Sequence, residues 1–267
     1  MLKERVLTAV IGLPLVLILA YIGGIPFAVL FFLAAELGLF EYMRCIGLEK
    51  SPLFGICAGM TAFLFAATYV CGIEMILFSV VLCFLLLCMY MVLRFDKTGF
   101  ETVTGSILGF VYIPVILMLF VLLREKSLCY MAYVLIAAWG SDTCAYFAGR
   151  ALGKHKMAPV LSPKKTWEGF VGGIIGAMVL ALVFSLIFKN SLTALPAPVA
   201  AGTAVTAFAS VFGVFGDLFA SAIKRTFGIK DYGKIFPGHG GMMDRIDSMI
   251  FCTPVIYFAF DFLERLH

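Results

Sequence analysis

A polar block at residues 221–247 contains the residue types in this chain that are best suited to chemistry. Its basic side chains precede a glycine-rich turn, and two carboxylates three residues apart, Asp244 and Asp247, follow that turn. The basic residues are Lys224, Arg225, Lys230 and Lys234. Ammonium and guanidinium groups bind phosphate, whereas carboxylates bind divalent cations. Because the flanking sequence is apolar, this block indicates phosphoryl or nucleotidyl chemistry on a lipid.

The residues before this block extend the same pattern. Asp217, Ser221 and Lys224 are spaced four and three residues apart, so they share one face of an expected helix. We expect Asp217 to meet Asp244 and Asp247 at the ends of two neighbouring helices. Hard oxygen ligands of this kind suit Mg²⁺, with substrate phosphates completing its shell. A second cation is left open.

An alternative reading of these charges is structural. Asp244 with Lys224, and Asp247 with Arg225, could form interhelical ion pairs that bind no metal. In the turn, Gly240 and Gly241 would let backbone amides approach an anion. His239 fits two roles equally well, as a general base or as a residue that orients the loop by hydrogen bonds.

Two further segments carry polar residues with a candidate role. Asp142 lies within an apolar span, where a carboxylate usually faces a polar cavity; a buried pair with Arg150 or with backbone is the alternative. The second segment, 162–169, reads Ser-Pro-Lys-Lys-Thr-Trp-Glu-Gly, and it suits a polyphosphate at a helix N-terminus. Its candidate binding residues are Ser162, Lys164, Lys165 and Thr166. Elsewhere, we expect Glu41 and Arg44 to form a local pair.

Composition sets the fold class. The chain of 267 residues is 63% hydrophobic and 13% charged, and its mean hydropathy is +1.06. These values predict an all-α, polytopic transmembrane helical bundle. We expect an N-terminal scaffold at residues 1–124 and a catalytic region at 125–267, because ionisable residues become organised only in the second half. The nine expected spans are 6–22, 25–44, 52–71, 73–93, 103–123, 128–148, 168–188, 197–222 and 247–265.

The distribution of basic residues predicts the orientation. Of the 20 Lys and Arg residues, 16 fall on the side of the membrane that holds the N-terminus. The positive-inside rule therefore predicts a cytoplasmic N-terminus and an external C-terminus. The sequence has no basic tract with interleaved aromatic residues, which argues against nucleic-acid binding. The eight cysteines lie mostly in apolar runs, as expected of reduced packing residues.

Residues 221–247 resemble the defining motif of the phosphatidate cytidylyltransferases, the CDP-diacylglycerol synthases. The resemblance rests on Ser-x-Ile-Lys-Arg from Ser221, Lys230-Asp231-x-Gly233, His239-Gly240-Gly241 and Asp244-Arg245-x-Asp247. Segments 141–143, 153–156 and 162–169 also resemble the family, which extends the similarity over residues 139–250. At position 220 the family often has a glutamate, whereas this chain has Ala220.

This resemblance implies a reaction, its cofactor and its setting. CTP and phosphatidate would give CDP-diacylglycerol and pyrophosphate, with Mg²⁺ required. The enzyme would be a multi-pass membrane protein and a homodimer, in the inner (plasma) membrane of a bacterium, with its site open to the cytoplasm. Asp217 and Asp244 would hold metal, and Asp247 would belong to the same cluster. Other family positions, such as Lys230, Asp231 and Arg245, would contact substrate.

Other functions remain in competition at this point. A CTP-dependent lipid kinase or another lipid nucleotidyltransferase needs similar residues, and only the product would separate them. A transporter of an anionic substrate is a rival of a different class. Transporters tend to show inverted repeats and binding sites at the midplane, whereas this sequence has no evident repeat and its polar residues cluster at one face. A purely structural membrane protein would gain nothing from so many intramembrane charges.

Overall fold

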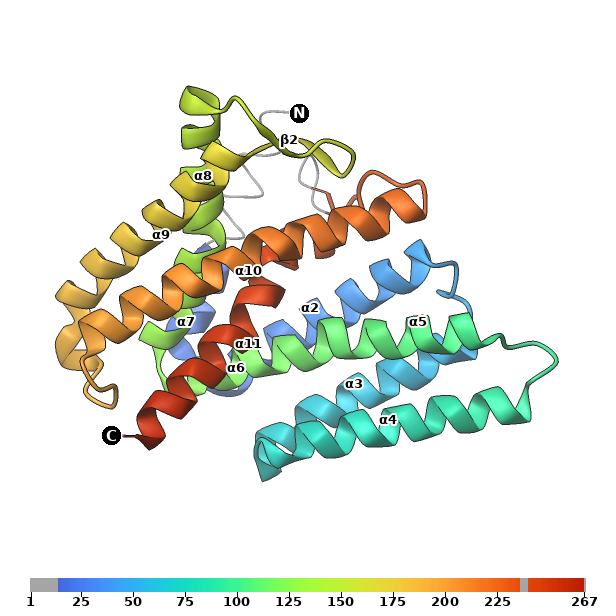
Figure 1. The fold of residues 1–267 in the computed structure, drawn as a ribbon. Coiled ribbons are helices and arrows are strands. Elements are labelled where there is room, and N and C mark those ends of the chain that lie inside the picture. The colour runs from blue at the N-terminus through green and yellow to red at the C-terminus, as the bar shows by residue number, and fades with distance from the viewer. Residues whose placement is uncertain (1–13, 236–239, 267) are drawn as a thin grey trace. The chain divides into compact units, whose positions relative to one another are not determined.

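The computed structural model describes residues 14–235 and 240–266, and these residues are almost entirely helical (Figure 1). Residues 14–22 are helical. The further helices are α2 (Gly24–Cys45), α3 (Pro52–Cys71), α4 (Glu74–Leu93), α5 (Phe100–Phe110), η1 (Val111–Val115), α6 (Ile116–Lys126), α7 (Leu128–Leu135), η2 (Ile136–Gly140), α8 (Ser141–Leu152), α9 (Trp167–Phe188), η3 (Lys189–Ser191), α10 (Pro198–Thr226) and α11 (Met243–Arg265). Strands β1 (Lys156–Ala158) and β2 (Ser162–Thr166) form one antiparallel pair. The all-α expectation is therefore confirmed, apart from this short hairpin.

Seven of the described helices are long and apolar enough to cross a membrane. They match the expected spans 25–44, 52–71, 73–93, 103–123, 168–188, 197–222 and 247–265. The helix from Phe100 to Lys126 contains the π-helical turn η1, which coincides with Pro114. Because proline has no amide hydrogen, it interrupts the regular helical ladder and favours such a local adjustment.

The other two expected spans are not among these seven. Most of the span 6–22 falls on residues 1–13, which lie outside the described residues. Residues 128–152 are helical, but they run through the π-helical segment η2 and carry Asp142 and Arg150. A count of nine spans thus stays a prediction, as does the cytoplasmic N-terminus.

The chain divides into two compact units. The first unit holds residues 1–122 and 227–245, and it contains α2 to α5. Its core includes the rings of Phe27, Phe31 and Phe120, whose centroids lie 4.7 to 6.1 Å apart. The segment 227–245, expected to belong to the C-terminal part, groups with this N-terminal unit. A scaffold role for one part and a catalytic role for the other stays a prediction.

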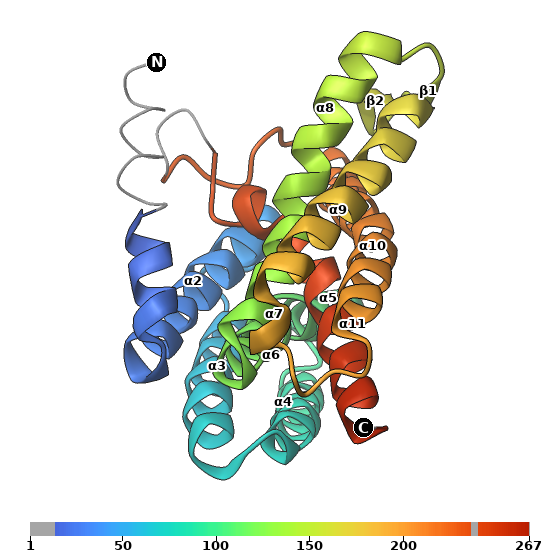
Figure 2. The same ribbon diagram turned by 90° about the vertical axis from the view of Figure 1, so that its left-hand side faces the viewer.

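The second unit holds residues 123–226 and 246–267. Helices α8, α9 and α10 lie side by side in it, and the β1–β2 hairpin joins the end of α8 to the start of α9 (Figure 2). Glycines of α9 allow this close approach. A Cβ atom at Gly169 would lie 2.9 Å from the carbonyl oxygen of Ala145, and one at Gly173 would lie 3.0 Å from that of Ser141. Small residues at such contacts are typical of helix pairs in membranes.

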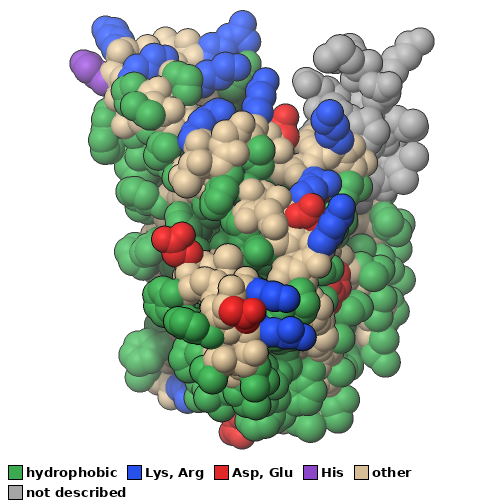
Figure 3. Space-filling view, turned by 90° about the vertical axis from the view of Figure 1, so that its right-hand side faces the viewer, with side chains coloured by type: hydrophobic (Ala, Val, Ile, Leu, Met, Phe, Trp, Pro, Cys, Tyr) green, Lys and Arg blue, Asp and Glu red, His purple; other side chains and the backbone are tan. Residues whose placement is uncertain are grey.

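The surface agrees with a membrane environment. Hydrophobic side chains cover the flanks and the lower part of the face drawn in Figure 3, whereas Lys and Arg side chains lie in its upper and central parts. Many large apolar residues of the spans are exposed, among them Leu77, Phe78 and Ile187. Such surface is unfavourable in water but not in lipid. The chain is therefore a multi-pass integral membrane protein.

Candidate active site

The candidate site is built around Asp217 on α10. Its carboxylate lies 2.7 Å from the ammonium nitrogen of Lys165. That ammonium group also donates to the carbonyl oxygen of Val214, one turn earlier on α10, at 3.3 Å. On the same helix face, the Ser221 hydroxyl donates to Asp217 at 3.5 Å. The expected common face for Asp217 and Ser221 is confirmed, whereas the contact with Lys165 was not expected.

The β1–β2 hairpin explains how Lys165 reaches α10. Lys165 lies on β2, one residue before Thr166, which caps the N-terminus of α9. The Thr166 hydroxyl accepts a hydrogen bond from the backbone N–H of Gly169 at 3.1 Å. Such a cap fixes the point where the strand becomes a helix. The geometry of the backbone at this junction therefore determines where the preceding lysine points.

Glu168 adds a second constraint at the same junction. Its carboxylate accepts hydrogen bonds from the backbone N–H groups of Lys154 and His155, at 3.0 and 3.2 Å, and lies 2.6 Å from Nδ1 of His155. The segment that leaves α8 is thus held against the first turn of α9. Glu168 therefore stabilises the conformation of the hairpin, and His155 is one of the residues to which Glu168 binds.

Asp142 and Asp247 lie near Asp217 in the same unit. The Ser248 hydroxyl donates to the Asp142 carboxylate at 3.1 Å, and the Ser248 amide donates to the carboxylate of Asp247 at 2.8 Å. Asp142 and Asp247 are both close enough to Asp217 for like-charge repulsion. Lys165 and Lys224 supply opposing positive charge. Among the described residues, the hydrogen-bond partner of Asp142 is Ser248 and not Arg150, which the alternative reading had named.

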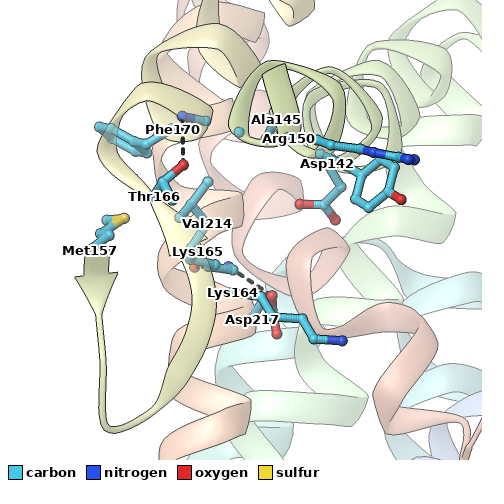
Figure 4. Close-up of a pocket in the computed structure, with 13 residues that line it drawn as sticks. Asp142, Ala145, Arg150, Met157, Lys164, Lys165, Thr166, Phe170, Val214 and Asp217 are labelled. Carbon is cyan, nitrogen blue, oxygen red and sulfur yellow. Dashed lines mark hydrogen bonds and ion pairs between the residues drawn. The ribbon is translucent and has the colours of Figure 1, made fainter. Parts of the chain in front are cut away.

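Asp142, Asp217 and Lys165 border a cavity of about 340 Å³ (Figure 4). The carboxyl groups of Asp142 and Asp217 and the ammonium group of Lys165 are directed toward this hollow. The polar and charged residues of its lining are Asp142, Tyr146, Arg150, Lys164, Lys165, Thr166 and Asp217. A volume of this size falls in the range of small-molecule sites. The cavity can receive an anionic ligand beside carboxylates.

The donor chemistry fits a hard divalent cation. Asp217 and Asp247, the two expected metal ligands in this unit, and their neighbour Asp142 offer oxygen atoms only. Oxygen atoms are the ligands that Mg²⁺ takes, and positive charge would relieve the repulsion among the three carboxylates. Within residues 14–235 and 240–266, no three side chains already surround a point suited to a metal ion. Substrate phosphates would have to supply part of the shell.

Asp244 belongs to the other unit, although it shares α11 with Asp247. Its carboxylate accepts hydrogen bonds from the backbone N–H groups of Tyr232, at 2.9 Å, and Gly241, at 3.0 Å. The two aspartates are three positions apart, so they lie on one side of the helix. That Asp244 converges with Asp217 stays a prediction.

Glu41 and Arg44 were expected to form a local pair, but both side chains also bind backbone groups that are distant in the sequence. Glu41 accepts a hydrogen bond from the backbone N–H of Met243 at 3.0 Å, and Arg44 donates to the carbonyl oxygen of Tyr232 at 2.5 Å. Both side chains of α2 therefore bind the distant segment 227–245.

The remaining candidate residues are more scattered. Lys230 and Asp231 line a second hollow, of about 510 Å³, in the first unit. Lys224 is buried at the end of α10, whereas Arg225 and Arg245 are exposed. Ser162 begins β2. His239 lies outside the described residues. Substrate contact by these residues stays a prediction.

A sequence model of the cytidylyltransferase family matches residues 3–263. The chain belongs to the cytidylyltransferase family. It is 38% identical to a phosphatidate cytidylyltransferase of Bacillus subtilis over 96% of each chain. It is 34% identical to a phosphatidate cytidylyltransferase of Staphylococcus haemolyticus and 32% identical to one of Staphylococcus aureus, in both cases over 95% of this chain and 97% of the relative. As a cytidylyltransferase, the protein is an enzyme.

Three residues of this cytidylyltransferase make long-range hydrogen bonds that the sequence analysis did not predict. They are Glu41, Glu168 and Ser248. For Ser248 the only signal was its place beside Asp247. For Glu41 the sequence showed only that the motif has glycines at 233 and 241, and the structure shows that a Cβ atom at either position would overlap the Glu41 carboxyl group. The two motif glycines therefore mark the place where a distant side chain must fit.

Proposed function

We propose that the enzyme transfers the cytidylyl group of CTP to phosphatidate, forming CDP-diacylglycerol and releasing pyrophosphate. The observation that carries this proposal is the cavity in which Asp142, Asp217 and Lys165 face one another beside the helix cap at Thr166. The names of the relatives, which match over nearly the whole chain, support the choice of substrates.

The chemistry that these residues suit is an in-line displacement. A phosphate oxygen of phosphatidate attacks the α-phosphorus of CTP, the bond from that phosphorus to the bridging oxygen breaks, and pyrophosphate carries the electron pair away. Both reactants are strongly anionic, so neutralising their charge is the main task of the protein. Lys164 and Lys165 perform it from the hairpin, and Lys224 and Arg225 from the end of α10.

No strong base is needed for this step. A phosphate monoester is already ionised at neutral pH, so the nucleophile carries its charge before it enters the site. His239 is therefore free to orient the loop. Asp217, Asp244 and Asp247 are the proposed holders of Mg²⁺, which when bound would neutralise charge on the phosphates. A second cation in the same cluster is an open part of this proposal.

We also propose a setting for the reaction. The acyl chains of the lipid stay in the bilayer while its phosphate reaches the cavity. The site faces the cytoplasm of a bacterial inner membrane, where CTP is made, and the active form is a homodimer. The excess of Lys and Arg in the loops that border the site supports this orientation.

The test uses purified enzyme in mixed micelles with phosphatidate, Mg²⁺ and CTP labelled in the α-phosphate. We expect the label to appear in a lipid product. Asp217→Asn should abolish the transfer, whereas Asp96→Asn makes the same change in an exposed loop and should leave it intact.

Two results would contradict the proposal. Lipid labelled only by γ-labelled CTP would identify a lipid kinase. Transfer of neither label by folded enzyme would favour the transporter.

A further inference from the structure

Glu41 is buried in an unusual way. Its residue has 0% of its surface exposed, and its Oε1 atom has no hydrogen-bond partner within the described residues. Burying a carboxylate costs free energy unless its oxygens are satisfied. Its Oε2 atom accepts a hydrogen bond from the backbone N–H of Met243 at 3.0 Å, and the backbone of Met242 also interacts with the carboxylate. Because burying this carboxylate costs free energy, and because its partner Met243 is 202 residues away in the sequence, we infer that Glu41 does more than fill space.

The surroundings of this carboxylate are the segment that holds Asp244. Gly233 and Gly241 lie so close to it that a Cβ atom on either would overlap the carboxyl group. Met243, whose amide it binds, is the first residue of α11, and Asp244 is the second. Glu41 thus lies between the two sides of the segment and bonds directly to the start of the helix that carries Asp244.

Arg44 completes the attachment one turn along α2. It donates to the carbonyl oxygen of Tyr232, and the amide of the same Tyr232 donates to Asp244 at 2.9 Å. The Gly241 amide supplies the second hydrogen bond to that carboxylate, at 3.0 Å. Arg44 therefore binds the carbonyl group of Tyr232, one of the two residues whose amides bind Asp244, and Glu41 packs against the other, Gly241. All of these contacts lie within the first unit.

We propose that Glu41 is a positioning residue that fixes residues 232–233 and 241–244 so that the carboxylate of Asp244 has one orientation. The shape of the Glu41 side chain and its hydrogen bond to Met243 do this, not its negative charge. The consequence for catalysis rests on the proposed function, in which Asp244 holds metal. Groups that orient a metal ligand affect metal affinity without touching the metal.

The first test does not depend on activity. Lys230 and Lys234 are exposed cleavage points for trypsin in this segment. In the full-length enzyme in micelles, Glu41→Ala should accelerate tryptic cleavage at these lysines by about tenfold, because a released segment opens more often. Glu41→Gln keeps the oxygen that accepts from Met243 and should be cleaved at nearly the original rate. Glu36→Ala is the matched control, because Glu36 is also on α2 but interacts electrostatically with Cys57 of α3.

The second test measures the Mg²⁺ concentration that gives half-maximal transfer. Glu41→Ala should raise it by about tenfold, as expected for loss of an orienting group, whereas Glu41→Gln and Glu36→Ala should leave it within about twofold of the original value. Gly241→Ala, which pushes a methyl group against the Glu41 carboxyl group, should behave like Glu41→Ala.

The outcomes separate this inference from the proposed function. Wild-type cleavage rates in Glu41→Ala would overturn the positioning role. Cleavage in Glu41→Gln as fast as in Glu41→Ala would show that the negative charge matters, and would overturn positioning by shape and hydrogen bonding. Faster cleavage with an unchanged Mg²⁺ requirement would overturn the metal role of Asp244 and leave the attachment of the segment established.

Discussion

The ammonium group of Lys165 lies 2.7 Å from the carboxylate of Asp217, although the two residues belong to a strand and a helix that are 52 positions apart. This pair joins the segment that suits phosphate to the carboxylate that suits metal. The pair also allows both side chains to hold their positions before substrate binds, because the ammonium and carboxylate charges balance each other.

Lys165→Met should lower kcat/KM by about a hundredfold, because one preorganised charge that stabilises the transition state is lost. Lys165→Arg should retain part of the activity, since it keeps the charge with another geometry. The measurement is the initial rate of transfer from α-labelled CTP. Lys97→Met, in an exposed loop, is the matched control. Unchanged rates in Lys165→Met would remove this lysine from the mechanism.

Ser248→Ala should slow the reaction by about tenfold, the worth of one hydrogen bond to a charged group. Its hydroxyl fixes the Asp142 carboxylate at 3.1 Å. If that is its main role, Ser248→Ala should add little to the defect of Asp142→Asn, and a double-mutant cycle measures this. Ser210→Ala is the control, because that buried hydroxyl bonds to its own helix. Fully additive defects would refute the coupling.

Gly169→Ala should destabilise the enzyme by about 1–3 kcal/mol, the usual cost of an overpacked contact. Its new methyl group would meet the backbone of Ala145 and Gly149 across the α8–α9 contact. Thermal unfolding in detergent would show a lower midpoint. At Gly59 on α3 the same substitution meets nothing within 4 Å. It should be neutral or slightly stabilising there, and equal effects at the two positions would contradict the packing argument.

Removal of divalent cations should abolish the transfer. We expect EDTA to stop it, added Mg²⁺ to restore it, and Asp217→Asn to require at least about tenfold more Mg²⁺ where any activity remains. A titration of rate against free Mg²⁺ provides the measurement. Full activity in excess EDTA would disprove the metal role of the aspartates.

The orientation can be tested with reporter fusions. A phosphatase that is active only outside the cytoplasm should be inactive when fused after Lys97 and active when fused after Ser127. The reason is the excess of basic residues expected on the inner side. The opposite pattern would place the cavity outside the cell, away from CTP.

The sequence predicted the helices well because their signals are local. An apolar run of about 20 residues is sufficient to identify a span, and the bounds of α3, Pro52–Cys71, coincide with the expected 52–71. The spacing of Asp217 and Ser221 placed both on one face of α10, as the structure has them. Thr166 was expected just before a helix, and it is the cap of α9.

The β1–β2 hairpin was not predicted, because its short strands lie between spans and carry mostly lysines and small residues. The sixth expected span, 128–148, contains the π-helical segment η2, which ends two residues before Asp142. No apolar pattern records such a change in helical period.

By itself, the sequence determined the membrane class, most of the spans, the residues that share a helix face and the motif of the family. Tertiary structure alone decided the partners: Lys165 for Asp217, Ser248 for Asp142 and Met243 for Glu41. The physical reason is distance along the chain. Helix periodicity relates residues three or four apart, whereas these pairs are 52, 106 and 202 residues apart, and only packing of the helices brings them together.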